Sequence, residues 1–292
     1  MDTKRYYMMG LPESGKTTFL VAFTFMLKDQ TEGTCLHLNP AEPPKGISKD
    51  FKEEMDRWGK FEPLGHTKIG QVHRMNYTLY DDEGQRYILE VPDRYGEIFS
   101  HIVKDRYVDD DTRTEWMAAD KILFFVNLDR MNIGTHEELL TELPPEMQKL
   151  LEEGQKSSDE ETDREDRKKE VMLPDQFVLV ELLQILQEIC KRDISIKFII
   201  SAWDHLQFEN TELEKQIPEK IFADRLPFVY QYVQSHSNRM NVEYWGVSAQ
   251  GSDLSDKGEI KKLAQALDPM ERVMVVDAQG EVSHDLSKIF VE

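Results

Sequence analysis

The sequence predicts an α/β fold in which a mostly parallel sheet has helices on both faces and one antiparallel edge strand. Short apolar runs alternate with loops and helical patterns along the chain, and this alternation is typical of parallel sheets. A hairpin signal supplies the edge strand, because Asp82-Glu83-Gly84 separates Met75–Tyr80 from Tyr87–Val91. The apolar runs expected to form strands are Tyr6–Met9, Tyr87–Val91, Ile122–Val126, Ile196–Ile200 and Val242–Val247.

Composition and charge restrict the class of protein. The chain has 292 residues, of which 39% are hydrophobic, so it can bury a sizeable core. Its formal net charge of −20 argues against a nucleic-acid partner or an anionic membrane, since both require clustered cations. The two cysteines, Cys35 and Cys190, lie far apart and without metal-ligand spacing, which suits a reducing compartment. The longest apolar run, Phe19–Leu27, is too short to cross a bilayer, so we expect a cytoplasmic protein without membrane insertion.

Residues 136–175 are expected to form a helical and acidic insertion in a single domain that spans residues 1–292. Within it, residues 152–170 contain nine acidic and five basic residues and almost nothing apolar. Such a segment cannot offset the entropy lost on ordering, and we expect it to be mobile. The helix predicted at Gln176–Cys190 is apolar nearly all round, which favours packing against the sheet over binding a partner.

A phosphate-binding loop is predicted at residues 10–17. The motif consists of Gly10, four further residues and Gly15-Lys16-Thr17, and it lies between the first expected strand and a helix at Thr17–Lys28. At such a junction the loop amides and the helix N-terminus converge on a phosphate. Lys16 is expected to bridge the β- and γ-phosphates, and the Thr17 hydroxyl to bind Mg²⁺. Thr18 is expected to cap the helix or contact the α-phosphate. The residues expected to hold the nucleotide here are Gly10, Glu13, Ser14, Gly15, Lys16, Thr17 and Thr18.

A second candidate site follows the strand at Tyr87–Val91. There Asp93-Arg94-Tyr95-Gly96 matches Asp-x-x-Gly, a weak pattern by itself that gains weight downstream of the phosphate loop and after a hairpin. Asp93 is expected to hold Mg²⁺ through water, and the Gly96 amide to bond the γ-phosphate, so that hydrolysis releases the segment.

Two further motifs follow the last two expected strands. Ser201-Ala202-Trp203-Asp204 stands where GTPases carry Asn-Lys-x-Asp, and Ser248-Ala249 is similar to the loop that touches the guanine oxygen. Four motifs in this order, each at the carboxyl end of a strand, resemble the Ras-like P-loop GTPase superfamily across nearly the whole chain. The resemblance implies a three-layer P-loop fold, GTP or GDP with Mg²⁺, and a protein effector. It also implies base contacts by Ser201, Trp203, Asp204, Ser248 and Ala249.

Within that superfamily the chain looks closest to the bacterial double-GTPase families of conflict systems. The shared features are a Trp-Gly turn at Trp58-Gly59 before a switch threonine at Thr67, and the unit Arg272–Gly280. This narrower resemblance implies a C-terminal hairpin and short helix over residues 270–292, and a partner that could be another GTPase domain.

The base motif departs from the family pattern. Ser201 is a shorter brace for the phosphate loop than Asn, and Ala202 cannot stack on a base as the Lys stem does. The preference for guanine should therefore be modest unless Trp203 covers the ring. The alternative is that Asp204 merely caps the following helix.

The switch and the attacking water are the remaining elements of the site. Thr67 is preferred over Thr31 and Thr34 as the switch threonine because it precedes the hairpin arm. Glu97 stands where Ras has its water-orienting Gln, and Arg94 could stabilise charge or form a surface ion pair. The expected catalytic residues are Lys16, Thr67, Gly96 and Glu97, and the expected metal ligands are Thr17, Thr67 and Asp93.

These motifs predict a Mg²⁺-dependent, GTP-hydrolysing switch protein that is slow without a partner and acts through protein partners. Two alternatives stay open from the sequence. One is a nucleotide-holding scaffold without useful turnover, and the other is a P-loop ATPase or nucleotide kinase.

Overall fold

The structure is a computed structural model that describes residues 3–29, 33–64, 74–92, 96–131, 174–206, 217–252 and 269–291. Nearly all of the predicted insertion over residues 136–175 lies outside these ranges, including residues 152–170. Thr31, Thr67, Asp93 and Arg94 lie outside them as well.

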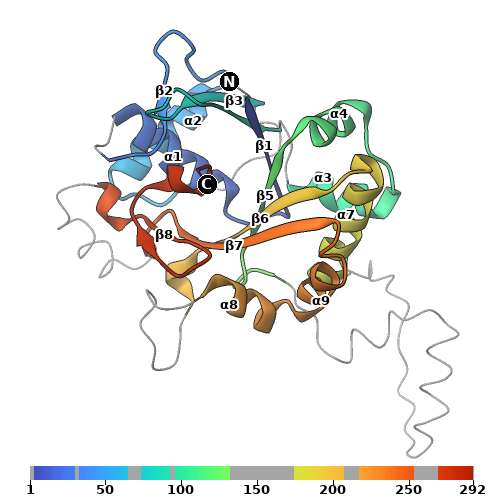
Figure 1. Cartoon of the computed structure of the whole chain (residues 1–292). Helices are drawn as coiled ribbons and strands as arrows, with labels where there is room; N and C mark the ends of the chain where they lie inside the picture. Colours follow the sequence, from blue (N-terminus) through green and yellow to red (C-terminus); the bar gives the residue numbers. More distant parts are fainter. Residues whose placement is uncertain are drawn as a thin grey trace, which may run out of the picture.

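A nine-stranded sheet runs through the described residues in the order β2-β3-β4-β1-β5-β6-β7-β8-β9 (Figure 1). Its central strands β4, β1, β5, β6 and β7 pair in parallel, as predicted. Crossover helices join these strands, as parallel pairing requires. The strands are β1 (Lys4–Gly10), β2 (His37–Leu38), β3 (Met75–Tyr80), β4 (Arg86–Val91), β5 (Lys121–Val126), β6 (Ile194–Ser201), β7 (Met240–Ser248), β8 (Met274–Val276) and β9 (Val282–Ser283).

Both edges of the sheet are antiparallel, whereas the sequence predicted one such edge. On one side β3 pairs with β4 as the predicted hairpin, and the short β2 pairs with β3. On the other side the C-terminal hairpin of β8 and β9 joins the same sheet, with Ser248 of β7 opposite Met274. The hairpin satisfies the backbone groups that β7 would otherwise leave unpaired at an open edge.

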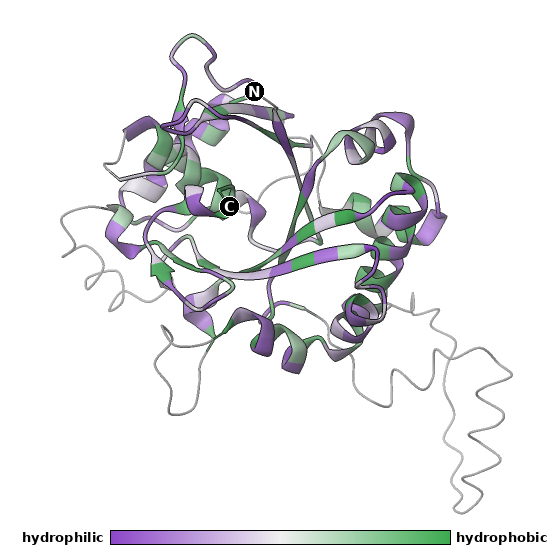
Figure 2. Ribbon diagram, in the orientation of Figure 1, coloured by the Kyte–Doolittle hydropathy of each residue, from purple (hydrophilic) through white to green (hydrophobic). Residues whose placement is uncertain are grey.

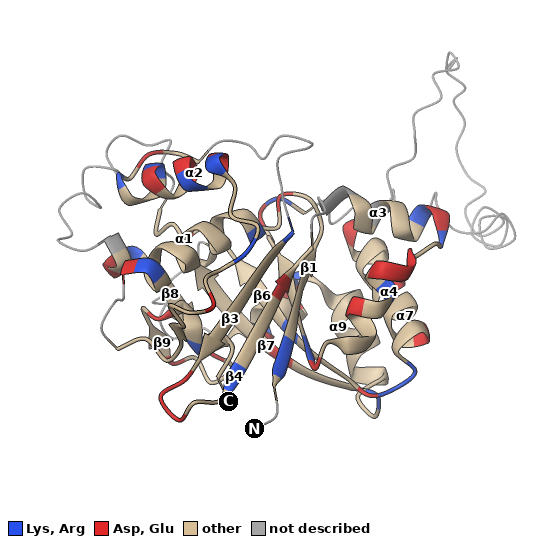
Figure 3. Cartoon of the chain, turned by 90° about the horizontal axis from the view of Figure 1, so that it is seen from above, with Lys and Arg blue, Asp and Glu red and all other residues tan. Residues whose placement is uncertain are grey.

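Helices cover the two faces of the sheet, and Figure 3 shows them on either side of it. On one face lie α1 (Lys16–Asp29) and α2 (Lys49–Gly59), with the short turn η4 (Leu286–Ile289). Charges of both signs alternate along α2. The helices on the other face are α3 (Gly96–Asp105), α4 (Asp110–Ala118), α7 (Asp175–Cys190), α8 (Pro218–Arg225) and α9 (Pro227–Ser235). None of the helices described here is long and apolar enough to cross a membrane.

The sheet separates two apolar cores, and the helices turn their apolar residues toward it (Figure 2). Along β1, Tyr6 and Met8 face the α1 side, while Tyr7 and Met9 face the α7 side. Successive side chains of a strand point to opposite faces, so a strand covered on both faces is apolar throughout. This is why the central strands appear in the sequence as continuous apolar runs.

The sequence suggested a turn at Trp58-Gly59. In the structure both residues belong to a helix. Both residues close α2, and the chain turns only at Phe61, whose φ is 60°. Gly59 is required because a Cβ there would lie 2.7 Å from the ring of Phe25 on α1. The fully buried ring of Trp58 also contacts Phe25, at 5.0 Å between centroids. The two helices therefore pack closely at this point.

Candidate functional site

The phosphate loop connects β1 directly to α1, and two glycines allow its path. A Cβ on Gly10 would lie 2.5 Å from the carbonyl oxygen of Phe125 on β5. Gly15 has a φ of 83°, and a Cβ there would lie 2.6 Å from Ser201 Oγ on β6. Glu13 also adopts a left-handed conformation, with φ 55°. The loop is therefore tightly held against the ends of two neighbouring strands, in backbone conformations that favour glycine.

Lys16 lies across this loop. Its ammonium donates hydrogen bonds to the carbonyl oxygens of Gly10 at 2.7 Å and Leu11 at 2.8 Å, and to Ser14 Oγ at 2.8 Å. Thr17 and Thr18 follow in the first turn of α1 and are half-buried. The N-terminus of a helix attracts anions through its free N–H groups and its dipole. The arrangement thus places one cation and a helix N-terminus at a single loop.

Asn127 also braces the phosphate loop, although it belongs to none of the predicted motifs. Its Nδ2 donates to the carbonyl oxygen of Glu13 at 3.3 Å, directly after the end of β5. Ser201 Oγ donates to the carbonyl oxygen of Val126 at 3.3 Å and abuts Gly15. The signal that could have revealed Asn127 is its position, because a polar residue directly after a central parallel strand faces the edge where ligands bind.

The carboxylate of Asp204 lies at the same edge of the sheet. Its side chain is 14% exposed, and among the described residues Oδ2 is buried and has no hydrogen-bond partner. The ring of His205 lies beside it, with Nε2 3.5 Å from Asp204 Oδ2 and Nδ1 3.7 Å from Asp129 Oδ2. A buried carboxylate oxygen without a partner is costly unless a ligand donates to it.

Asp204 caps none of the described helices, since it lies within the short turn η1 (Trp203–His205). Ala202 precedes that turn with φ 50°, so the chain bends sharply as β6 ends. This bend turns the chain away from the strand direction before Asp204.

Trp203 lies in the core and not at the surface of the site. Its side chain is fully buried, and a Cβ on Gly246 of β7 would lie 2.5 Å from two of its indole carbons. The ring belongs to the apolar core on the α7 side of the sheet. The ring therefore has no exposed face that could cover a base. The sequence predicted a modest guanine preference unless Trp203 covers the base, and Trp203 does not cover it.

The Ser248-Ala249 loop lies beside the Asp204 loop because β6 and β7 are neighbours, with Ser201 opposite Val247. Ser248 is buried, and its Oγ accepts a hydrogen bond from the Gly251 amide at 3.0 Å. The Ala249 carbonyl accepts a hydrogen bond from Trp58 Nε1 at 3.0 Å. The structure thus brings the phosphate loop and both predicted base loops to one edge of the sheet.

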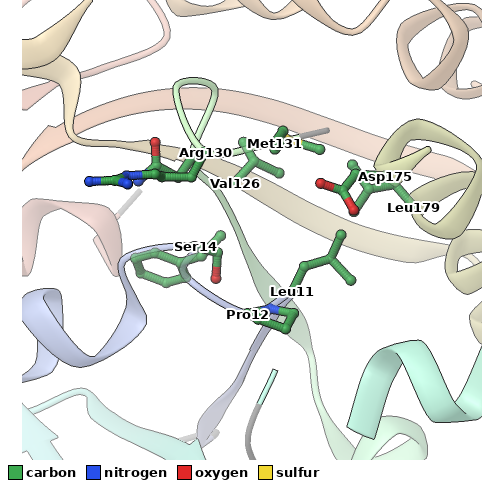
Figure 4. A pocket seen from close by; sticks show the side chains of 10 residues that line it. Leu11, Pro12, Ser14, Val126, Arg130, Met131, Asp175 and Leu179 are labelled. Atoms are coloured by element: carbon green, nitrogen blue, oxygen red, sulfur yellow. The ribbon is translucent and has the colours of Figure 1, made fainter. Parts of the chain in front are cut away.

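A small pocket borders the phosphate loop on the α7 side (Figure 4). Leu11 and Pro12 form one wall, and Met131, after β5, forms the wall opposite. Arg130 and Asp175 lie at its two ends. Asp175 is the first residue of α7. The pocket therefore lies between the phosphate loop and the residues on either side of 132–173, Met131 and Asp175.

The other predicted site residues either lie away from the phosphate loop or fall outside the described residues. Gly96 begins α3 and Glu97 follows it, but the side chain of Glu97 is outside the described part, as are Thr67 and Asp93. Thr34 is 92% buried and contacts His37 Nδ1 at 3.5 Å, so it is packed inside the protein. In the described ranges no cluster of three His, Cys, Asp or Glu side chains could hold a metal.

The strand order and the loop between β1 and α1 define a P-loop α/β fold, in which both predicted base loops lie at the same edge of the sheet. The family model Double-GTPase 1 matches residues 7–290, and the chain belongs to this family of GTPases. This confirms the resemblance to double-GTPase families and the GTP-binding class. No curated protein matches the chain.

Three solved structures are similar to the chain at low sequence identity. The Arl6 BBS3 small GTPase from Trypanosoma brucei is 11% identical, with a TM-score of 0.37 over 90% of this chain and 98% of that one. The signal recognition particle receptor SRb-GTP/SRX complex from Chaetomium thermophilum is 12% identical, with a TM-score of 0.36 over 91% and 99%. The bacterial selenocysteine-specific elongation factor EF-Sec is 12% identical, with a TM-score of 0.35, and 30% of its chain is covered.

Proposed function

We propose that this protein is a Mg²⁺-dependent switch that binds GTP, hydrolyses it slowly and acts on protein partners in the cytoplasm. The observation that carries the base assignment is the buried Oδ2 of Asp204, which lacks a hydrogen-bond partner among the described residues. Guanine presents two neighbouring N–H donors that a carboxylate accepts together. Binding of guanine would therefore satisfy a group that is otherwise costly to bury.

The phosphates fit the loop between β1 and α1. The amides at the start of α1 and the Lys16 ammonium supply the positive potential, while Gly10 and Gly15 allow the backbone to approach closely. The Thr17 hydroxyl would bind Mg²⁺, and the sequence predicts Asp93 and Thr67 as further ligands. When bound, the metal neutralises charge on the β- and γ-phosphates.

The base preference should be real but modest. Ala202 carries a methyl group, and Trp203 is buried in the core, so neither residue supplies a stacking surface for the ring. Recognition then depends on hydrogen bonds that Asp204 accepts from the base and that the Ser248-Ala249 loop donates to it. Each such bond in a buried site contributes about 1–3 kcal/mol.

Hydrolysis would depend on the residues at the start of α3. The Gly96 amide would bond the γ-phosphate and the Glu97 carboxylate would orient water, although that carboxylate adds negative charge beside the phosphate. Slow intrinsic turnover with acceleration by a protein partner follows from this arrangement. The partner could be an effector or a second GTPase domain.

The base assignment is tested by competition binding of GTP, ATP and XTP to the wild type and to Asp204→Asn. An amide in place of the carboxylate donates where guanine also donates, so GTP affinity should fall about ten- to a hundredfold while XTP affinity rises. Asp129→Asn is the matched control, because it removes the other carboxylate beside His205 and should leave the base preference unchanged. Equal binding of all three nucleotides by the wild type would reduce the assignment to a general P-loop nucleotide-binding protein.

Turnover is tested by phosphate release from GTP and ATP with and without Mg²⁺. Release from GTP that requires Mg²⁺ supports the switch. Tight GTP binding with no release, also in the presence of a purified partner, would identify a nucleotide-holding scaffold instead.

A further inference from the structure

Trp58 connects two parts of the proposed nucleotide site, α1 and the loop at Ala249. Its ring packs against Phe25 of α1, the helix that begins at the phosphate loop. Its indole N–H donates to the Ala249 carbonyl at 3.0 Å, across 191 residues of chain. The side chain is fully buried, so this hydrogen bond is protected from water. In a buried site such a bond holds its acceptor in a defined orientation.

Arg272 fixes Trp58 from the other side. The guanidinium lies over the Trp58 ring at 3.9 Å and over the Phe61 ring at 4.4 Å from the ring centroids. One of its Nη atoms donates to the Trp58 carbonyl oxygen. Arg272 is 6% exposed, and its Nε and Nη1 have no hydrogen-bond partner among the described residues. Cation–π contacts of this kind are strongest when the cation is shielded from water.

Arg272 also touches the loop that follows Ala249. Gly251 has a φ of 87°, and a Cβ there would lie 2.7 Å from both the Cβ and the carbonyl oxygen of Arg272. The Gly251 amide in turn donates to Ser248 Oγ. Residues 248–251 are therefore held at one point by Trp58 and at another by the backbone of Arg272.

We propose that Trp58 and Arg272 are positioning residues that set the base preference of the site by holding the Ser248–Gly251 loop in place. The proposal rests on the proposed function, in which this loop meets the oxygen of guanine. Guanine presents an acceptor where adenine presents an amino donor, so an amide held there favours one base and rejects the other. Recognition groups must be held to about 0.5 Å for such discrimination.

Two substitutions separate positioning from general stability. Trp58→Phe keeps an aromatic ring between Phe25 and Arg272 but removes the donor to Ala249. Arg272→Met keeps an unbranched stem of similar length but removes the charge and the donor to Trp58. Arg272 has no carboxylate partner among the described residues, so Arg272→Met leaves no opposite charge uncompensated in the core and should fold. Burial lowers the pKa of Arg272 to about 10, which reflects the cost of burying its charge.

The test is competition binding of GTP and ATP against a fluorescent guanine nucleotide, with thermal unfolding measured for each variant. We expect both variants to weaken GTP about fivefold to thirtyfold, the equivalent of one buried hydrogen bond, with ATP changed less than about twofold. Trp116→Phe is the matched control. It alters a fully buried indole in the opposite core, and both affinities should stay at the wild-type value.

The outcomes distinguish this proposal from the proposed function. If the wild type prefers GTP and Asp204→Asn removes that preference, the base assignment stands. Variants of Trp58 and Arg272 that then keep the wild-type GTP to ATP ratio, or weaken both nucleotides equally, overturn the positioning role. A wild type that binds GTP and ATP equally overturns both proposals.

Discussion

At the residue scale, the hydrogen bonds of the Lys16 ammonium lie within the phosphate loop itself. Lys16 bonds to two carbonyl oxygens and one hydroxyl, all between residues 10 and 14. None of these contacts connects distant elements. We therefore expect substitution of Lys16 to affect nucleotide binding more than stability.

Lys16→Ala should lower the affinity for Mg-nucleotide at least about a hundredfold, because charge-assisted bonds to phosphate contribute about 1.5–3 kcal/mol each. Titration with a fluorescent nucleotide measures this loss, and circular dichroism checks the fold. Lys28→Ala, near the other end of the same helix, is the control and should bind normally. A folded Lys16→Ala protein with unchanged affinity would refute the phosphate-loop assignment.

At the element scale, ion pairs link β5, β6 and β7 at the end of the sheet opposite the candidate site. Glu243 of β7 bonds Lys121 of β5 at 2.9 Å and lies 3.3 Å from Lys197 of β6. Lys197 is 1% exposed and lies 4.5 Å from the Trp245 ring centroid. Burial by itself raises the pKa of Glu243, but the hydrogen bond from Lys121 and the two positive charges outweigh it and leave the pKa below its usual value of 4.5.

Glu243→Gln should therefore lower the free energy of unfolding at pH 7 by about 1–3 kcal/mol, since it removes charge-assisted bonds to a buried cation. Because the pKa of Glu243 is lowered in the folded protein, its stabilisation is complete above the unfolded pKa and disappears as the pH falls through the folded pKa. Urea unfolding of both proteins between pH 7 and pH 3 should show the difference shrinking below about pH 4.5.

Glu53→Gln is the control for Glu243→Gln. It breaks an exposed pair with Lys49 on α2 and should change stability by less than about 0.5 kcal/mol. A Glu243→Gln effect that is constant across this pH range would show that the charge of Glu243 is not its cause.

At the scale of the whole molecule, the last residues close the fold against its first strand. Tyr6 of β1 donates to the Phe290 carbonyl at 2.6 Å, and Lys197 donates to the Ile289 carbonyl at 2.8 Å. The ring of Phe290 is fully buried and lies 5.2 Å from the rings of both Tyr6 and Phe23. The C-terminal turn thus fills the core between the sheet and α1.

Phe290→Ala should destabilise the protein by about 3–5 kcal/mol, because it leaves a cavity in a packed core. Chemical denaturation measures the change. Phe228→Ala, at a ring that is 46% exposed on α9, should cost about 1 kcal/mol or less. Equal effects of the two substitutions would show that the C-terminal turn is not part of the cooperative core.

The sequence by itself determined the features that depend on neighbouring residues. The phosphate loop, the hairpin at Met75–Tyr80 and the central strands follow from local pattern, because a Gly-rich loop, a turn signal and an apolar run each act over a few residues. The order of motifs then placed the predicted binding loops at one edge, since parallel strands end on the same side.

The tertiary structure decided what distant residues do to one another. Trp203 is buried because it packs against Gly246 on the next strand, and the same position in sequence could equally have faced a base. The terminal hairpin extends the sheet because β7 offers an open edge, and Trp58 meets Ala249 and Arg272 only after the chain has folded. Such contacts depend on which elements become neighbours in space, and no local pattern encodes that choice.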